Sequence, residues 1–246
     1  MPIALLSDLH GNLEALEACL RHARGEGALR YAFLGDLVGY GADPQATVDI
    51  VRRYAAEGAI AVKGNHDEAM EKRAGYMNEA TKDSIDWTRK ALDGAHKAFL
   101  AALPLLAREQ DMCFVHASAA SPARWDYVDG PGAAKRSAEA AQAAYVFCGH
   151  VHEQLLYFEN SQGKWSAFRP TPGHAVPVSR RRRWLAIVGS SGQPRDGKAA
   201  AAYALFDRER EQLTFYRVPY DHLAAARKIR QAGLPEFHAF RVERGV

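Results

Sequence analysis

The sequence repeatedly places a short apolar run directly before a cluster of polar residues, and this pattern constrains the fold most. An apolar run of about four residues bounded by glycine and polar residues is typical of a buried strand. Five such runs end in the motifs SDLHGN, GDLVGYG, KGNHDE, HAS and GHVHE. These runs lie at residues 3–6, 31–34, 59–62, 112–115 and 145–148. Each polar motif is therefore expected at the end of a strand.

Helical segments separate the first three runs. Asn12 is placed to cap a helix whose apolar face includes Leu16 and Leu20. Asp43 and Pro44 are typical of the N-cap and first position of a second helix, which would end near residue 57. This alternation of strand and helix predicts an α/β fold with right-handed crossovers.

The rest of the chain is expected to continue as one unit. We predict helix throughout 67–102, a loop over 118–132 and mostly strands over 153–218. A final helix from 221 to about 232 would be followed by a short tail that ends at 246. The sequence shows no internal repeat and no long linker. Residues 1–246 are therefore predicted to form a single domain.

The composition is that of a globular protein with little net charge. The chain of 246 residues is 48% hydrophobic and 25% charged, and its net charge is +3. This balance argues against a dedicated nucleic-acid binder, although the arginine run at 180–183 keeps nucleic acid as an alternative partner. The chain has no basic leader, no membrane-length apolar run and no C-x-x-C pair among its three cysteines. We expect a cytoplasmic protein that does not insert into membranes, with its oligomeric state left open.

Seven side chains in the five motifs are of the types that bind metal ions. Ligands of open α/β sheets bind outside the carboxyl ends of the strands, so the motifs would converge if their strands are parallel neighbours. His150 and His152 would share one strand face, because successive strand side chains alternate. On their own, these two histidines indicate either a polar strand end or a pair of metal ligands. The full set has two carboxylates, four imidazoles and one amide: Asp8, Asp36, His10, His116, His150, His152 and Asn65.

This set of donors suggests both a metal centre and a reaction. Nitrogen and oxygen ligands without thiolate suit Mn, Fe, Zn, Ni or Co better than Mg or Ca. Seven ligands suit two divalent ions, which would share a carboxylate and a bridging water about 3.5–4 Å apart. With two carboxylates and a hydroxide, such a site has a net charge of about +1 and attracts an anion, and metal-bound water is available as hydroxide near pH 7. The expected reaction is attack of this hydroxide on a phosphate ester.

In this order, the motifs DLH, GD, GNH, VHA and GHVH resemble those of the calcineurin-like metallophosphoesterases. The downstream stretches GSSGQPRDG, AAYALFD and YRVPYD are similar to a bacterial, phosphodiesterase-like branch of predicted phosphoesterases in that superfamily. The resemblance covers nearly the whole chain. It implies a four-layer α/β/β/α sandwich of two mixed sheets flanked by helices, with the metal ions at the sheet ends.

The resemblance also implies a role for each motif residue. Asp36 would bridge the two ions, and Asn65 would contact both metal and substrate. His66 would not bind metal but would protonate the leaving alkoxide as a general acid. One ion would be held by Asp8, His10, Asp36 and His152, and the other by Asp36, Asn65, His116 and His150.

The sequence departs from the protein-phosphatase branch of the family after the GD motif. Gly39 and Tyr40 stand where that branch has an aspartate that orients the acid histidine and an arginine that binds phosphate. Asp67 is the candidate for the first role. Arg195 is the candidate for the second, with a structural turn role as its alternative. The loss of both groups argues against a phosphoprotein substrate.

Four aromatic residues are candidates for the rim of the cleft, where they would stack on a base or an aryl leaving group, with ordinary packing as the alternative for each. They are Tyr40, Tyr76, Trp125 and Tyr127. The favoured function is therefore hydrolysis of a small phosphodiester or nucleotide-like substrate. A phosphoprotein phosphatase or nuclease with the same chemistry is the alternative, and a non-catalytic protein-interaction module is the third reading.

Overall fold

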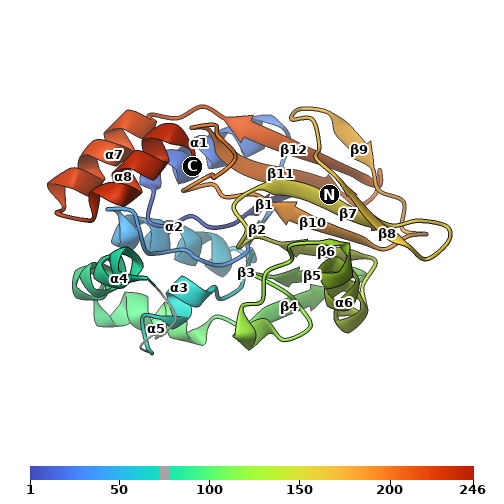
Figure 1. Cartoon of the computed structure of the whole chain (residues 1–246), viewed down its shortest axis with the longest axis horizontal. Coiled ribbons are helices and arrows are strands. Elements are labelled where there is room, and N and C mark those ends of the chain that lie inside the picture. Colours follow the sequence, from blue (N-terminus) through green and yellow to red (C-terminus); the bar gives the residue numbers. More distant parts are fainter. Residues whose placement is uncertain (73–77) are drawn as a thin grey trace.

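The computed structural model describes residues 1–72 and 78–246, so that the predicted rim residue Tyr76 lies outside the described residues. The strands form two mixed sheets of six strands each (Figure 1). The first sheet has the order β3 (Ile60–Ala61), β2 (Arg30–Phe33), β1 (Ile3–Leu6), β11 (Ala201–Asp207), β12 (Gln212–Val218) and β9 (Ala175–Pro177). The second has the order β4 (Leu106–Glu109), β5 (Met112–Val115), β6 (Tyr145–Cys148), β10 (Trp184–Val188), β7 (Gln154–Glu159) and β8 (Trp165–Phe168).

The five motif-bearing strands are not all parallel neighbours, because they divide between the two mixed sheets. β1, β2 and β3 are parallel in the first sheet, whereas β5 and β6 are parallel in the second. Their motifs still meet, because the two sheets pack face to face. Hydrogen bonds join the sheets at the strand ends: His150 N–H donates to Asp8 Oδ2 (3.0 Å), and His116 Nδ1 donates to the Leu34 carbonyl (2.8 Å).

Alternating side chains divide the core into three apolar layers. In β1, Ala4 and Leu6 face the helices, while Leu5 faces the second sheet. In β6, Phe147 faces the first sheet and Val146 faces a helix on the other side. This period of two is expected of strands that are covered on both faces.

Helices cover the outer face of each sheet. α1 (Leu13–Gly25) and α2 (Pro44–Ala56) pack on the first sheet, and α6 (Pro131–Ala141) packs on the second. The predicted four-layer α/β/β/α sandwich is therefore confirmed.

The predicted start signals of the first two helices hold, with one difference. Asn12 Oδ1 accepts a hydrogen bond from Ala15 N–H at the start of α1 (3.2 Å). Pro44 begins α2, but the Asp43 side chain makes no capping hydrogen bond and instead pairs with Lys228 (3.0 Å). Asp43 thus connects α2 to the C-terminal part of the chain.

The prediction of continuous helix over 67–102 was wrong. The described part holds α3 (Asn65–Glu68), α4 (Glu79–Ala91) and α5 (Gly94–Ala102). Asp93 interrupts the helical run, because its carboxylate accepts from His96 N–H (2.9 Å) and so caps a new helix. Residues rich in helix propensity surround this cap, and the composition therefore did not reveal the break.

The predicted tail after residue 232 is also a helix. α7 (His222–Gln231) is followed by α8 (Glu236–Arg244), and the two lie side by side at one end of the molecule (Figure 1). Pro235 precedes α8, and Gly245 ends it with a left-handed φ of 70°. Sequence analysis also missed the short strand β4, whereas β8 and β9 lie within the region 153–218 that was predicted to be mostly strand. Within the described residues, no helix is long and apolar enough to cross a membrane.

The aromatic layer between the sheets offers a test of the fold. Phe147 is buried and packs on Phe114 and Phe206. We expect Phe147→Ala to lower the free energy of unfolding by about 3–5 kcal/mol, because it leaves a cavity between the sheets. Phe168→Ala, at a site that is 38% exposed, should cost less than about 1 kcal/mol. Urea unfolding of both variants would measure the difference, and equal losses would contradict the assigned layers.

Candidate metal centre and active site

The backbone at the predicted ligands adopts a conformation that non-glycine residues rarely take. Left-handed φ angles between 48° and 67° occur at Asp8, His10, Asp36, His150 and His152. Each such residue costs on the order of 1–3 kcal/mol, and these outliers cluster at functional sites. All five follow the end of a strand, where the turn directs their side chains to the junction of the two sheets. This shared strain is independent support for a functional site here.

The first group of side chains contains Asp8, His10 and His152, with Asp36 beside them. His152 Nε2 lies 3.1 Å from Asp8 Oδ1, and His10 Nε2 lies 3.2 Å from His152 Nε2. The Asp36 Oδ2 atom is 3.8 Å from His10 Nε2. Ligand atoms of the first three residues all lie within 4.8 Å of one another.

The second group shares Asp36 and adds Asn65, His116 and His150. His116 Nε2 lies 3.1 Å from His150 Nδ1, 3.2 Å from Asn65 Oδ1 and 3.4 Å from Asp36 Oδ2. Asp36 therefore lies between the two groups, and the structure brings together all seven side chains that the motifs predicted.

The hydrogen bonds of the imidazoles determine which nitrogen faces the centre. The Nδ1 atoms of His10, His116 and His152 lie 3.2, 2.8 and 2.6 Å from the backbone carbonyls of Val38, Leu34 and Gln193. A carbonyl only accepts, so each Nδ1 must carry the proton, and in a neutral ring the Nε2 lone pair then points inward.

This arrangement fits metal ions. The inward lone pairs of His10 and His152 face each other across 3.2 Å, which is unfavourable unless a cation lies between them. Asp8 Oδ1 has no hydrogen-bond donor among the described residues. A backbone carbonyl on the outer nitrogen is also the usual partner of a metal-binding histidine.

The charges of the centre lead to the same conclusion. Asp8 and Asp36 are buried, and no lysine or arginine of the described chain lies within ion-pair distance of them. Burial opposes their ionisation, but the surrounding histidines hold the pKa of Asp36 well below its ordinary value. Burial lowers the pKa of His150 to about 3, whereas the Asp36 carboxylate overcomes burial at His116 and raises its pKa to about 9. The two buried carboxylates outnumber the one imidazolium that this shift produces, so the centre attracts further cations.

His66 lies beside this centre without a polar partner at its outer nitrogen. Its backbone N–H donates to Asp36 Oδ1 (2.8 Å), and its Nε2 lies 3.9 Å from Asp36 Oδ2. Its buried Nδ1 has no hydrogen-bond partner in the described chain. Gly39 packs directly against Nδ1: a Cβ at Gly39 would lie only 2.4 Å away, and the φ of 87° there favours glycine.

The expectation that Asp67 orients His66 was wrong. The two carboxylate oxygens of Asp67 accept from Leu37 N–H and Gly64 N–H, both at 2.9 Å. Asp67 therefore holds the GD and GNH loops together and has no acceptor oxygen directed at His66.

A cavity of about 400 Å³ opens beside the centre. Tyr40, Trp125, Tyr127 and Arg195 line it, together with Asp36, Asn65, His66, His150 and His152. The Tyr127 ring stacks on His150 with centroids 4.1 Å apart. The backbone N–H of Arg195 donates to the His152 carbonyl (3.2 Å), and the guanidinium carbon of Arg195 lies 5.8 Å from the Tyr40 ring centroid.

Sequence analysis missed two parts of the site. The loop after β10 supports Asp8, because Ser190 Oγ donates to the Asp8 carbonyl (2.8 Å), and it also provides the Gln193 carbonyl that orients His152. Helix α8 contributes Phe237, His238 and Arg241 to the cavity. The proline before α8 and the glycine after it were signals for this helix, but nothing in its sequence indicated that it reaches the site.

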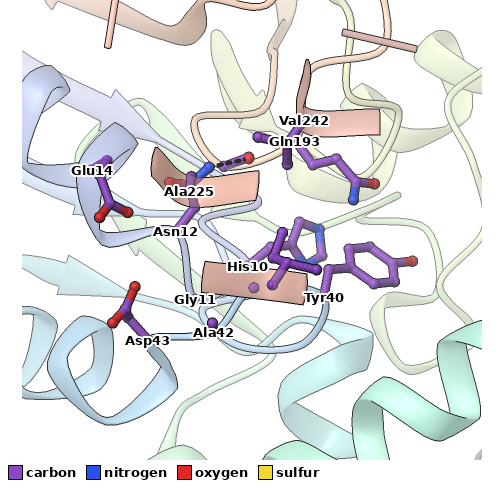
Figure 2. A pocket seen from close by; sticks show the side chains of 13 residues that line it. His10, Gly11, Asn12, Glu14, Tyr40, Ala42, Asp43, Gln193, Ala225 and Val242 are labelled. Carbon is purple, nitrogen blue, oxygen red and sulfur yellow. Dashed lines mark hydrogen bonds between the residues drawn. The ribbon is translucent and has the colours of Figure 1, made fainter. Parts of the chain in front are cut away.

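A second, much smaller cavity shows how the C-terminal helices contact the centre. Figure 2 shows Asn12, Ala225 and Val242 around a cavity of about 10 Å³ behind His10. The dashed bond in Figure 2 joins Asn12 Nδ2 to the Gly192 carbonyl (2.7 Å). Helices α7 and α8 thus pack on the loops that carry the candidate ligands.

Comparison with known proteins agrees with this geometry. The chain is 32% identical to an uncharacterised protein of Methanocaldococcus jannaschii, with 96% of this chain and 94% of that protein covered. It is 35% identical to a metallophosphoesterase from Sphaerobacter thermophilus, with a TM-score of 0.90 and complete coverage of both chains. A hypothetical protein from Pyrococcus horikoshii shares the fold, with a TM-score of 0.78 at 19% identity over 100% of this chain and 98% of that one.

A family model of the calcineurin-like phosphoesterase superfamily domain matches residues 1–211. The match includes all five motifs and the loop after β10, and it ends before α7 and α8. The chain therefore belongs to the calcineurin-like phosphoesterases, a superfamily of metal-dependent hydrolases of phosphate esters.

Proposed function

We propose that this protein hydrolyses a small phosphodiester or nucleotide-like phosphate ester at a centre of two divalent transition-metal ions. The observation that carries this proposal is the position of Asp36, whose Oδ2 lies 3.8 Å from His10 Nε2 in one group and 3.4 Å from His116 Nε2 in the other. One ion alone would leave several inward-facing donors without a partner, whereas two ions would use the full set.

The candidate ligands divide along the two groups. Asp8, His10, Asp36 and His152 would hold one ion, and Asp36, Asn65, His116 and His150 would hold the other. Mn, Fe, Zn, Ni and Co all suit such a mixed set of nitrogen and oxygen ligands. When bound, the ions would supply Lewis acidity and a water nucleophile at neutral pH.

The chain's own residues would bind the ester and transfer the proton. His66 has a free Nε2 edge beside Asp36 and lines the cavity, which suits a general acid for the leaving alkoxide. Arg195 would bind a phosphate oxygen, because it lines the cavity with its guanidinium carbon 5.8 Å from the Tyr40 ring centroid. Tyr40 would form part of the substrate wall, and Asn65 would contact both ion and phosphate.

The geometry gives less support to a macromolecular substrate. Two arginines of the basic run are paired: Arg180 with Glu211 (2.5 Å) and Arg183 with Glu159 (2.7 Å). The complete ligand set favours an enzyme over an interaction module. We place the enzyme in the cytoplasm, in keeping with its three buried free cysteines, and regard residues 1–246 as one domain because α8 contributes to the cavity.

Hydrolysis of p-nitrophenyl phosphate and bis-p-nitrophenyl phosphate by metal-stripped protein tests the activity directly. We expect no turnover without metal and turnover after addition of Mn²⁺, because the candidate ligands alone provide no nucleophile. A higher rate on the bis-ester would identify a diesterase. Absence of turnover with each of the five candidate metals would contradict the proposal.

The shared carboxylate can be tested by metal content. Asp36→Asn removes the negative charge between the two groups, so both ions should bind more weakly, by more than the ~10–100-fold typical of residues that only support ligands. Metal analysis after equilibrium dialysis would measure the stoichiometry. Asp111→Asn, which removes a carboxylate that pairs with Arg208 away from the site, serves as the control. Two tightly held ions in Asp36→Asn would rule out the shared ligand.

The general-acid role predicts a dependence on the leaving group. His66→Ala should slow hydrolysis of alkyl phosphate esters by about 10²–10⁴-fold, because a poor leaving group needs a proton. It should slow nitrophenyl esters by only about tenfold or less, since nitrophenolate leaves without one. Metal content should be unchanged. An equal loss on both ester classes would remove this role from His66.

A further inference from the structure

Two arginines that line the main cavity have no acidic partner. They are Arg195, in the loop after β10, and Arg241, on α8. Neither forms an ion pair with a carboxylate in the part of the chain that the structure describes. Nearby arginines differ in this respect: Arg217 pairs with Asp196 (2.6 Å), and Arg230 binds both Glu236 and Glu243. Other described arginines, such as Arg53 and Arg108, also lack a carboxylate partner, so Arg195 and Arg241 are distinguished by their place in the cavity beside the metal centre.

The hydrogen bonds of these two guanidiniums are incomplete. Arg195 donates from Nη2 to the neutral amide oxygen of Gln193 (3.0 Å), and its buried Nε has no partner in the described chain. Arg241 lies over the Phe237 ring, with its guanidinium carbon 4.3 Å from the ring centroid. Both arginines line the same cavity, where burial and the Arg195 charge together lower the pKa of Arg241.

Among the described residues that line the cavity, Asp36 is the one acidic residue, and it belongs to the metal centre. Arg124 also lines the cavity, but it pairs with Asp126 (3.4 Å). Two guanidiniums without a carboxylate form a site for a dianion, and their planar forks match phosphate oxygens.

Aromatic side chains at the same cavity indicate which chemical group the anion would be attached to. Tyr127 and Phe237 are 55% and 45% exposed, although both are large apolar side chains. Tyr40 is almost buried and stacks on His238, with ring centroids 4.5 Å apart. Flat exposed rings next to guanidiniums are suited to stack on a planar heterocycle.

We propose that the cavity binds a nucleotide with two separate phosphate groups: one at the metal centre, contacted by Arg195, and a second held by Arg195 and Arg241 together. The base would lie against the exposed rings of Tyr127 and Phe237. This inference rests on the proposed function for the position of the first phosphate. It assigns to α8, which lies beyond the matched family domain, the selection of the substrate.

Binding of two matched nucleotides tests the second phosphate site separately from ester hydrolysis. Isothermal titration calorimetry of metal-loaded protein would compare adenosine 3′,5′-bisphosphate with adenosine 5′-monophosphate. We expect the bisphosphate to bind at least about tenfold more tightly, since charge-assisted hydrogen bonds to a second phosphate are gained. Arg241→Gln should remove most of this preference, and Arg241→Lys should restore part of it because it returns the charge but not the planar fork.

Arg244→Gln is the matched control, because it removes the same charge from the exposed side of the same helix. Its preference for the bisphosphate should equal that of the unmodified protein. Equal binding of the two nucleotides, or equal effects of Arg241→Gln and Arg244→Gln, would overturn the inference. If the metal-loaded protein hydrolyses nitrophenyl esters but does not discriminate the nucleotides, only this inference fails. If it discriminates them but hydrolyses no ester, only the proposed function fails.

Discussion

The buried carboxylate of Asp36 is the interaction on which the rest of the site depends. Its Oδ1 accepts the backbone N–H of His66, and its Oδ2 faces imidazoles from both sheets. A buried charge without a permanent partner is costly, so the fold must provide compensation. No lysine or arginine in the described chain pairs with it, and the surrounding donors have lone pairs that point inward. Bound metal ions would both balance the buried carboxylate charge and accept the inward-pointing lone pairs.

This requirement explains why the loops around the centre are strained. The ligand-bearing turns take left-handed conformations at five non-glycine residues, and the strain is tolerated because hydrogen bonds fix each turn. Asp8 N–H donates to the Gly35 carbonyl, and Gly192 N–H donates to the Asp8 carbonyl. The loops of β1, β2 and β10 thus support one another. The tightly packed sheets behind them provide a rigid base for this arrangement.

The surroundings of His66 separate this protein from the protein-phosphatase pattern. Gly39 leaves no room for a side chain at His66 Nδ1, and Asp67 is used to connect two backbone loops. Packing against Gly39 and the Tyr40 ring, rather than a carboxylate, holds the imidazole in place. Burial lowers the pKa of His66 to about 4, although the Asp36 carboxylate opposes this shift. The C-terminal helices then add the arginine and aromatic side chains that the motif region lacks.

The sequence by itself determined the candidate ligands and the α/β class of the fold. Each ligand follows a short apolar strand, and this local signal does not depend on long-range contacts. The resemblance added the order of layers and the role of each motif residue. Only the tertiary structure decided that the motif strands belong to two sheets, that Asp67 is directed away from His66 and that α8 lies over the cavity. These features depend on which surfaces pack together. Asp93, which caps α5, and Arg241, on α8, illustrate why the sequence does not reveal them. A cap inside a helix-rich run and an arginine on an amphipathic helix have the same local sequence signals whether or not they are near an active site.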